Sequence, residues 1–78
     1  MTLAAQLRAA RVMLGLSQAE VAARASLSVP TIKRAEADTG IRVSADVRAA
    51  IRAVLEASGI EFTDGEAPGV RLRRKRRK

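Results

Sequence analysis

The spacing of apolar residues predicts two amphipathic helices, one near each end of the first 58 residues. Within residues 2–14 the apolar positions recur every three or four residues and share one helix face; these positions are Leu3, Leu7, Ala10 and Leu14. Gly15 is the expected C-cap of this helix. The later helix is expected between a cap at Ser44 and a stop at Gly59, and its apolar face consists of Val47, Ile51, Val54 and Leu55.

Two shorter helices, joined by a tight corner, are predicted between these two. Ser17 and Glu20 form an S-x-x-E capping box, which favours a helix start at this point. Ser28, after a corner over residues 26–28, is the expected cap of the next helix, with Pro30 in its first turn, where a missing N–H has no cost. Ile32 and Ala35 are expected to face the core. The outward face of this helix then consists of Pro30, Thr31, Lys33 and Arg34. Two helices joined by a three- to four-residue corner form the unit that places a helix in the DNA major groove.

The stretch from Leu16 to Glu36 resembles the helix-turn-helix of Cro and phage-repressor proteins, also called the xenobiotic-response-element family, and the resemblance covers about residues 3–55. It implies a mainly α, four-helix fold of the lambda-repressor type and binding to double-stranded DNA. It also implies that Gln18 binds a DNA phosphate, that the third helix reads bases, and that a buried Arg11 pairs with Glu36. The chain departs from the family at the corner, where Ser26 replaces the usual Gly; a left-handed backbone there would cost a Ser about 1 kcal/mol.

Arg34 is the side chain most suited to reading a base, because a bidentate Arg–guanine pair is the commonest specific contact. Lys33 suits a phosphate or a base equally, and Thr31 can offer its methyl group or its hydroxyl. Val29 and Pro30 offer only shape and apolar contact, so we expect DNA shape to supplement a few hydrogen bonds. The full expected DNA-binding set is Gln18, Ser28, Val29, Pro30, Thr31, Lys33, Arg34 and Arg42.

A β-hairpin is predicted after the last helix, because residues 60–63 and 70–73 alternate apolar and polar around a loop of turn residues. A lone hairpin is marginal in water, so its apolar side must pack on the last helix of the same chain or on a second copy; the sequence leaves both open. The expected dimer contacts are Ile51, Leu55, Ile60, Phe62, Val70 and Leu72. The chain is thus divided into a helix-turn-helix domain (1–58), a hairpin dimerisation element (59–72) and a basic tail (73–78).

Positive charge is concentrated at the C-terminus. The formal net charge is +7; seven of the 15 Lys and Arg residues follow residue 70, and the other eight are balanced by eight acidic residues. We expect the tail to be disordered without a partner and to seek phosphates, with RNA, an acidic protein or simple solubilisation as alternatives. Arg8, Arg48 and Arg52 are interpreted as surface charges.

The composition argues against several classes of function. The chain has no Cys and no His, which removes the commonest metal ligands and the usual general base. No cluster of titratable groups suits a nucleophile and its base, so we expect no enzyme activity, metal or cofactor. No apolar run approaches the ~20 residues of a membrane span, and the N-terminus lacks a signal-peptide pattern. We therefore expect a cytoplasmic protein without membrane contact.

Two functional hypotheses follow from these features. The first is a homodimeric transcriptional regulator, for example a repressor, that places two recognition helices ~34 Å apart on a palindromic operator and blocks or contacts RNA polymerase. The second is a protein-binding module or antagonist that uses the same scaffold. The second is kept because residues 1–70 carry no formal net charge.

Overall fold

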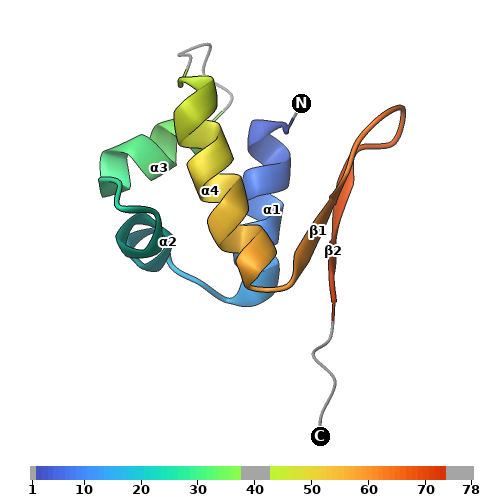
Figure 1. Cartoon of the computed structure of the whole chain (residues 1–78), viewed down its shortest axis with the longest axis horizontal. Helices are drawn as coiled ribbons and strands as arrows, with labels where there is room; N and C mark the ends of the chain where they lie inside the picture. Colours follow the sequence, from blue (N-terminus) through green and yellow to red (C-terminus); the bar gives the residue numbers. More distant parts are fainter. Residues whose placement is uncertain (1, 38–42, 74–78) are drawn as a thin grey trace, which may run out of the picture.

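In the computed structural model, which describes residues 2–37 and 43–73, four helices precede an antiparallel β-hairpin (Figure 1). The mainly α fold with a C-terminal hairpin that the sequence predicts is therefore confirmed. The elements are α1 (Ala4–Leu14), α2 (Gln18–Ala25), α3 (Val29–Glu36), α4 (Ala45–Ala57), β1 (Ile60–Thr63) and β2 (Gly69–Leu72).

Serine side chains begin three of these helices, as the sequence predicts. Each serine hydroxyl accepts a hydrogen bond from the backbone N–H three residues later; the pairs are Ser17 with Glu20 (3.0 Å), Ser28 with Thr31 (3.3 Å) and Ser44 with Val47 (3.1 Å). Gly15 ends α1 in the left-handed region, with φ 70°. Ser26 adopts the same region at the corner between α2 and α3, with φ 56° and ψ 43°. Ser26, in place of the usual Gly, therefore has the left-handed backbone whose strain is expected to cost about 1 kcal/mol.

The start of α1 differs from the prediction. The helix begins at Ala4 rather than at Thr2, because Leu3 is its extended N-cap residue and is 45% exposed. Gln6 takes the inward position instead, is only 4% exposed, and accepts a hydrogen bond from the Leu3 N–H at 2.8 Å. The predicted apolar face of α1 is thus wrong at its first residue and misses a buried amide.

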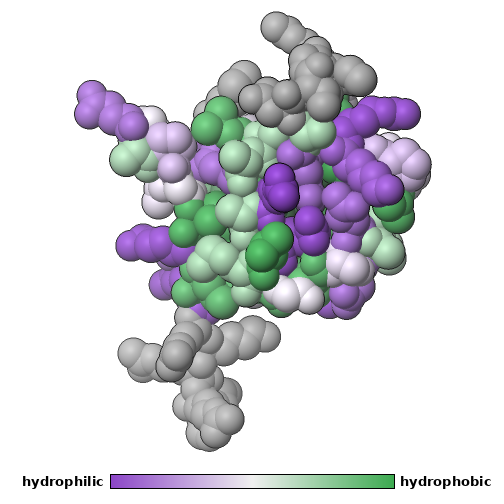
Figure 2. All heavy atoms as spheres, turned by 180° about the vertical axis from the view of Figure 1, so that it is seen from behind, coloured by the Kyte–Doolittle hydropathy of each residue, from purple (hydrophilic) through white to green (hydrophobic). Residues whose placement is uncertain are grey.

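The core is aliphatic and draws on every helix and on β1. Its fully covered side chains are small or branched; the buried apolar residues are Leu7, Ala10, Val21, Ala22, Ile32, Ala35, Ile51, Leu55 and Ile60. Large apolar side chains also stay exposed, among them Val12 (60%) and Met13 (46%) on α1. Seen from behind, hydrophobic side chains gather over α1 and beside the hairpin, next to a hydrophilic region (Figure 2).

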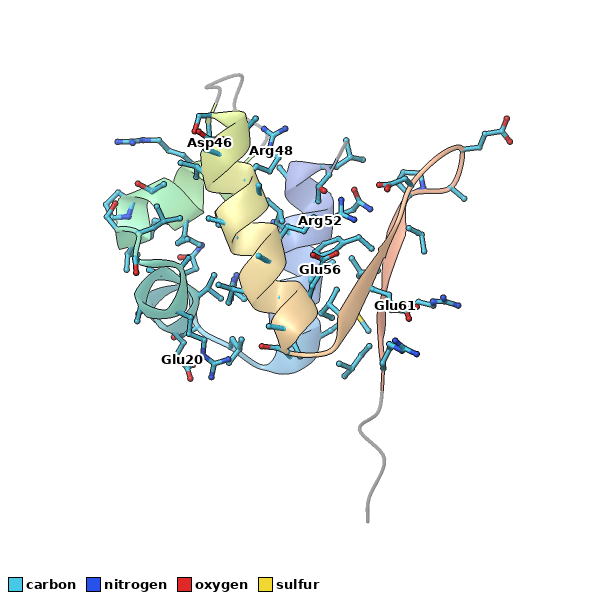
Figure 3. The ribbon with its side chains drawn as sticks, viewed as in Figure 1. Glu20, Asp46, Arg48, Arg52, Glu56 and Glu61 are labelled. Atoms are coloured by element: carbon cyan, nitrogen blue, oxygen red, sulfur yellow. The ribbon has the colours of Figure 1, made fainter. Side chains whose placement is uncertain are left out.

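The hairpin pairs within its own chain and packs against α1 and α4, which answers a question that the sequence leaves open. Phe62 lies opposite Val70 in the pairing register, with the Arg52 guanidinium 4.9 Å from the centre of its ring. Arg52 reaches from α4 toward the hairpin to make this contact (Figure 3). The Gln6 amide donates to the carbonyls of Thr63 and Gly69, at 2.8 and 3.0 Å, and so fixes the far end of the hairpin to α1.

This packing changes the expected dimer contacts. Ile51 and Leu55 have no exposed surface and Ile60 is 3% exposed, so their own chain leaves nothing for a partner to contact. Phe62 and Val70 are partly buried against the same core. Of the six expected residues only Leu72, at 42%, is well exposed. Ile51, Leu55 and Ile60 are therefore core residues rather than dimer contacts.

Two sequence predictions lie outside the described residues, namely Arg42 as a DNA contact and the tail after Arg73. The basic residues that precede this point are already engaged: Arg71 and Arg73 each form an ion pair with Glu61, at 2.6 and 2.9 Å. In the described part of the chain, no helix has the length and apolar character needed to cross a membrane.

Candidate nucleic-acid interface

Helix α3 presents a polar, exposed face at the edge of the molecule opposite the hairpin (Figure 1). Ile32 and Ala35 point into the core, at 0% and 1% exposure. Lys33 and Arg34 lie on the exposed side and have no ion-pair or hydrogen-bond partner for their side chains among the described residues. Their charges are therefore available to a ligand, as the sequence predicts for a recognition helix.

The first turn of α3 is less available than expected. Val29 is half-buried and packs against the core, so little of it can contact a base. The Thr31 hydroxyl lies 2.8 Å from the Ser28 hydroxyl, in the cap of the helix. Pro30 is exposed but has no donor. The long charged side chains of α3 that can donate to a base edge, Lys33 and Arg34, lie on its second turn.

Arg11 and Glu36 form a bidentate ion pair that joins α1 to the end of α3. Arg11 Nε lies 2.8 Å from Glu36 Oε2, and Arg11 Nη2 lies 3.0 Å from Oε1. The remaining terminal nitrogen of Arg11 donates to the Leu16 carbonyl at 3.0 Å. The two side chains are 16% and 4% exposed, so water screens this pair only weakly. The pair fixes the angle between α1 and α3.

Gln18 stands in the first turn of α2 and is oriented by the same ion pair. Its Nε2 donates to Glu36 Oε1 at 3.3 Å. A side-chain amide has a second N–H, and the first backbone N–H groups of a helix have no partner within it. Gln18 therefore lies where a helix N-terminus favours an anion, with its amide held by Glu36.

These residues surround an open hollow of about 480 Å³ between α1, α2 and α3. We call it the cationic hollow; it is lined by Arg8, Arg11, Ser17, Gln18, Lys33, Glu36 and Ala37. The Glu36 charge is compensated by Arg11, so Arg8 and Lys33 leave the hollow with excess positive charge. A phosphate group is an anion of suitable size and charge for such a site.

Arg8 is a residue that sequence reasoning missed. The sequence indicates only a surface charge at this position, yet Arg8 lines the cationic hollow together with Arg11. The sequence does contain one signal for this role, the three-residue spacing between Arg8 and Arg11, because residues three apart on a helix lie on adjacent parts of one face. Only the packing of α1 against α3 shows which face this is.

A capping box of Ser17 and Glu20 begins α2. Glu20 Oε1 accepts the Ser17 N–H at 2.9 Å, and the Glu20 N–H donates to the Ser17 hydroxyl at 3.0 Å. The pKa of Glu20 is lowered from its ordinary value of 4.5, first by the hydrogen bond from the Ser17 backbone and then by its side chain. Glu20 is therefore ionised at neutral pH and stabilises the helix start.

Residues 2–63 match the sequence profile of a family described as a helix-turn-helix domain, which shows that the chain belongs to this family. The match spans all four helices and β1. Membership supports a DNA-binding regulator and agrees with the exposed, capped α3. No curated protein matches the chain.

Proposed function

We propose that the chain is a sequence-specific transcriptional regulator of the Cro and phage-repressor type, which binds a palindromic operator in double-stranded DNA as a homodimer. Helix α3 of each copy would enter one of two successive major grooves, ~34 Å apart. Such a protein would act by its position on DNA, as a repressor that blocks RNA polymerase or by contact with the polymerase.

The observation that carries this proposal is the cationic hollow beside the exposed side of α3. A phosphate held by Arg8, Gln18 and Lys33 would set the distance and angle of α3 relative to the DNA backbone. Backbone contacts of this kind position a protein without reading sequence. Arg34, exposed on the second turn of α3, is then the side chain proposed to read a guanine.

The two proposed roles predict different effects on DNA binding. Arg34→Ala should weaken operator binding by about 1–3 kcal/mol and relax preference at one base pair per half-site. Arg8→Ala should weaken binding to all duplexes and lower the slope of log K against log salt by about 0.9 for each phosphate that the variant no longer binds. Arg24→Ala is the matched control, because Arg24 is an exposed arginine on α2 that does not line the hollow.

Selection of bound sites from a random duplex pool provides the operator, and competition at ~150 mM salt then tests specificity. A selected duplex should compete far better than random DNA. Equal competition by the two would reject the regulator and favour the protein-binding module. Loss of affinity for Arg34→Ala on random DNA as large as that on the operator would make Arg34 a phosphate contact instead.

The tail makes a separate, sequence-independent contribution in this proposal. Deletion of residues 74–78 retains the ion pairs of Arg71 and Arg73 with Glu61. It should reduce affinity for all duplexes and flatten the salt dependence without changing the selected sequence. An unchanged salt slope would show that the tail does not contact DNA.

A further inference from the structure

One face of α1 remains apolar and exposed after the chain has folded. Ala5, Ala9, Val12 and Met13 follow each other at intervals of four, three and one residues and therefore share a face. Leu72, on the neighbouring β2, extends this face and is 42% exposed. We call these five residues the apolar strip. Figure 2 shows the molecule from the side on which hydrophobic side chains gather over α1.

The strip is larger than scattered apolar exposure would explain. Val12 is 60% exposed and Met13 46%, and both alanines are exposed as well. Together the five side chains present on the order of 300 Å² of apolar surface, which is comparable with the largest patch on a typical single chain, and such patches are often functional. The strip contains no charged residue, although 29% of the whole chain is charged.

We propose that the apolar strip is the surface on which a second copy of this chain docks, with the two α1 helices packed antiparallel around Ala9. This inference rests on the homodimer of the proposed function and specifies its interface. In such a pairing Ala9 of one copy faces Ala9 of the second copy. Ala5 of each copy faces Met13 of the other, because the two residues lie four positions before and after Ala9. The Ala9 pair lets the helices approach closely, and on either side of it a small Ala5 lies opposite a large Met13, which lets the helices interdigitate.

The strip is self-complementary, as the interface of a twofold dimer must be. A standard interface buries roughly 800 Å² per partner, a little more than half of it apolar. The apolar strip supplies most of that apolar part. The expected alternative, a contact through Ile51, Leu55 and Ile60, offers almost no exposed surface.

The direction of the DNA-binding surface fits this pairing. Successive helix residues are rotated by about 100°, so Arg8 lies roughly a quarter turn around α1 from Ala9, the central residue of the strip, and Arg11 lies farther around the helix. The twofold axis of an antiparallel helix pair is perpendicular to both helices and to the line joining them. Surfaces a quarter turn from the contact therefore face the same way in both copies. Arg8, which lines each cationic hollow, would therefore lie on the same side of both copies, where one duplex could contact both.

Disulfide trapping tests this register directly, because the chain has no cysteine of its own. Ala9→Cys places two thiols at the twofold axis, within the roughly 4.4–6.8 Å between Cα atoms that a disulfide spans. Oxidation of this variant should convert most of the full chain to a covalent dimer at tens of micromolar. Ala53→Cys, at an exposed alanine of α4, is the control and should stay largely monomeric on a denaturing gel.

A charge placed in the strip provides the second test. Ala9→Glu would bring two carboxylates together at the axis and should raise the dimer dissociation constant at least tenfold in sedimentation, while Ala53→Glu should leave it unchanged. Thermal unfolding of both variants shows whether they are folded. Together with trapping through Ala9→Cys, such a result supports the proposed interface.

The outcomes separate this inference from the proposed function. If the intact chain is a dimer but Ala9→Glu leaves it dimeric, or Ala9→Cys is not trapped, the interface lies elsewhere; the inference is then overturned and the homodimeric regulator stands. If the intact chain is a monomer at tens of micromolar and binds its selected operator one copy at a time, both are overturned.

Discussion

Replacement of Glu36 by Ala is the most informative test of how the fold positions α3. Glu36 is 4% exposed in its side chain and accepts two hydrogen bonds from Arg11 and one from Gln18. Its removal leaves the Arg11 guanidinium, only 16% exposed, with the Leu16 carbonyl as its one remaining acceptor within residues 2–37 and 43–73. Glu36→Ala therefore removes one member of a buried, well-formed ion pair and strands the other.

Breaking a buried ion pair from one side costs about 3–5 kcal/mol, and the partial exposure of Arg11 places the expected loss near the lower limit, about 3 kcal/mol. For a domain of this size each kcal/mol shifts the melting temperature by about 4–8 °C. Glu36→Ala should therefore melt at least about 12 °C below the parent protein. Because the core of a domain of this size rarely supplies more than about 3–5 kcal/mol, this loss removes most of the free energy of unfolding.

Thermal unfolding followed by far-ultraviolet circular dichroism measures this loss, and a double-mutant cycle assigns it. The cycle compares Arg11→Met, Glu36→Leu and the variant that carries both changes. The double variant should be more stable than Arg11→Met or Glu36→Leu alone, because no buried charge is left without a partner. A melting temperature for Glu36→Ala within about 2 °C of the parent would refute this reasoning and assign the pair the small value of an exposed one. Additive losses in the double variant would refute the coupling.

Three further predictions follow from local geometry. Ser26→Gly should raise the melting temperature by a few degrees, because glycine adopts the left-handed backbone without the ~1 kcal/mol strain of serine; a lower value in calorimetry would contradict this. Gln6→Leu should leave two hairpin carbonyls without their donor, costing about 1–3 kcal/mol, and should speed hydrogen exchange in the hairpin more than in the helices. Glu20→Ala should reduce stability at neutral pH, and the difference should disappear in acid as the pH falls through the lowered pKa of Glu20, since a carboxylate with a depressed pKa stabilises only when ionised; a difference that persists at low pH would show that the carboxylate charge is not the cause.

Local chemistry made much of this fold predictable. The serine caps, the glycine after α1 and the capping box of Ser17 and Glu20 act within three or four residues, so their positions in the sequence determine where helices begin and end. The left-handed conformation at Ser26 is an expectation that comes from the family resemblance, because the family usually has Gly at this position. The inward face of α3 follows from its helical period.

The errors arose where a residue's role depends on which element packs beside it. Leu3 fits the apolar period of α1, but the helix starts one residue later, and Gln6 is buried because the hairpin carbonyls need a donor at that place. Ile51 and Leu55 have the same apolar pattern whether α4 packs on its own chain or on a second one. Periodicity identifies a buried face but not what covers it.

For this protein the sequence by itself determined the order of the elements, their caps and the outward residues of α3, because those depend on neighbours along the chain. Tertiary structure alone decided that Arg8 joins Gln18 and Lys33 around one hollow, that the hairpin folds back on α1 and α4, and that α1 keeps an apolar strip. These features depend on contacts between residues far apart in the sequence, and helical or strand periodicity carries no information about which faces will meet.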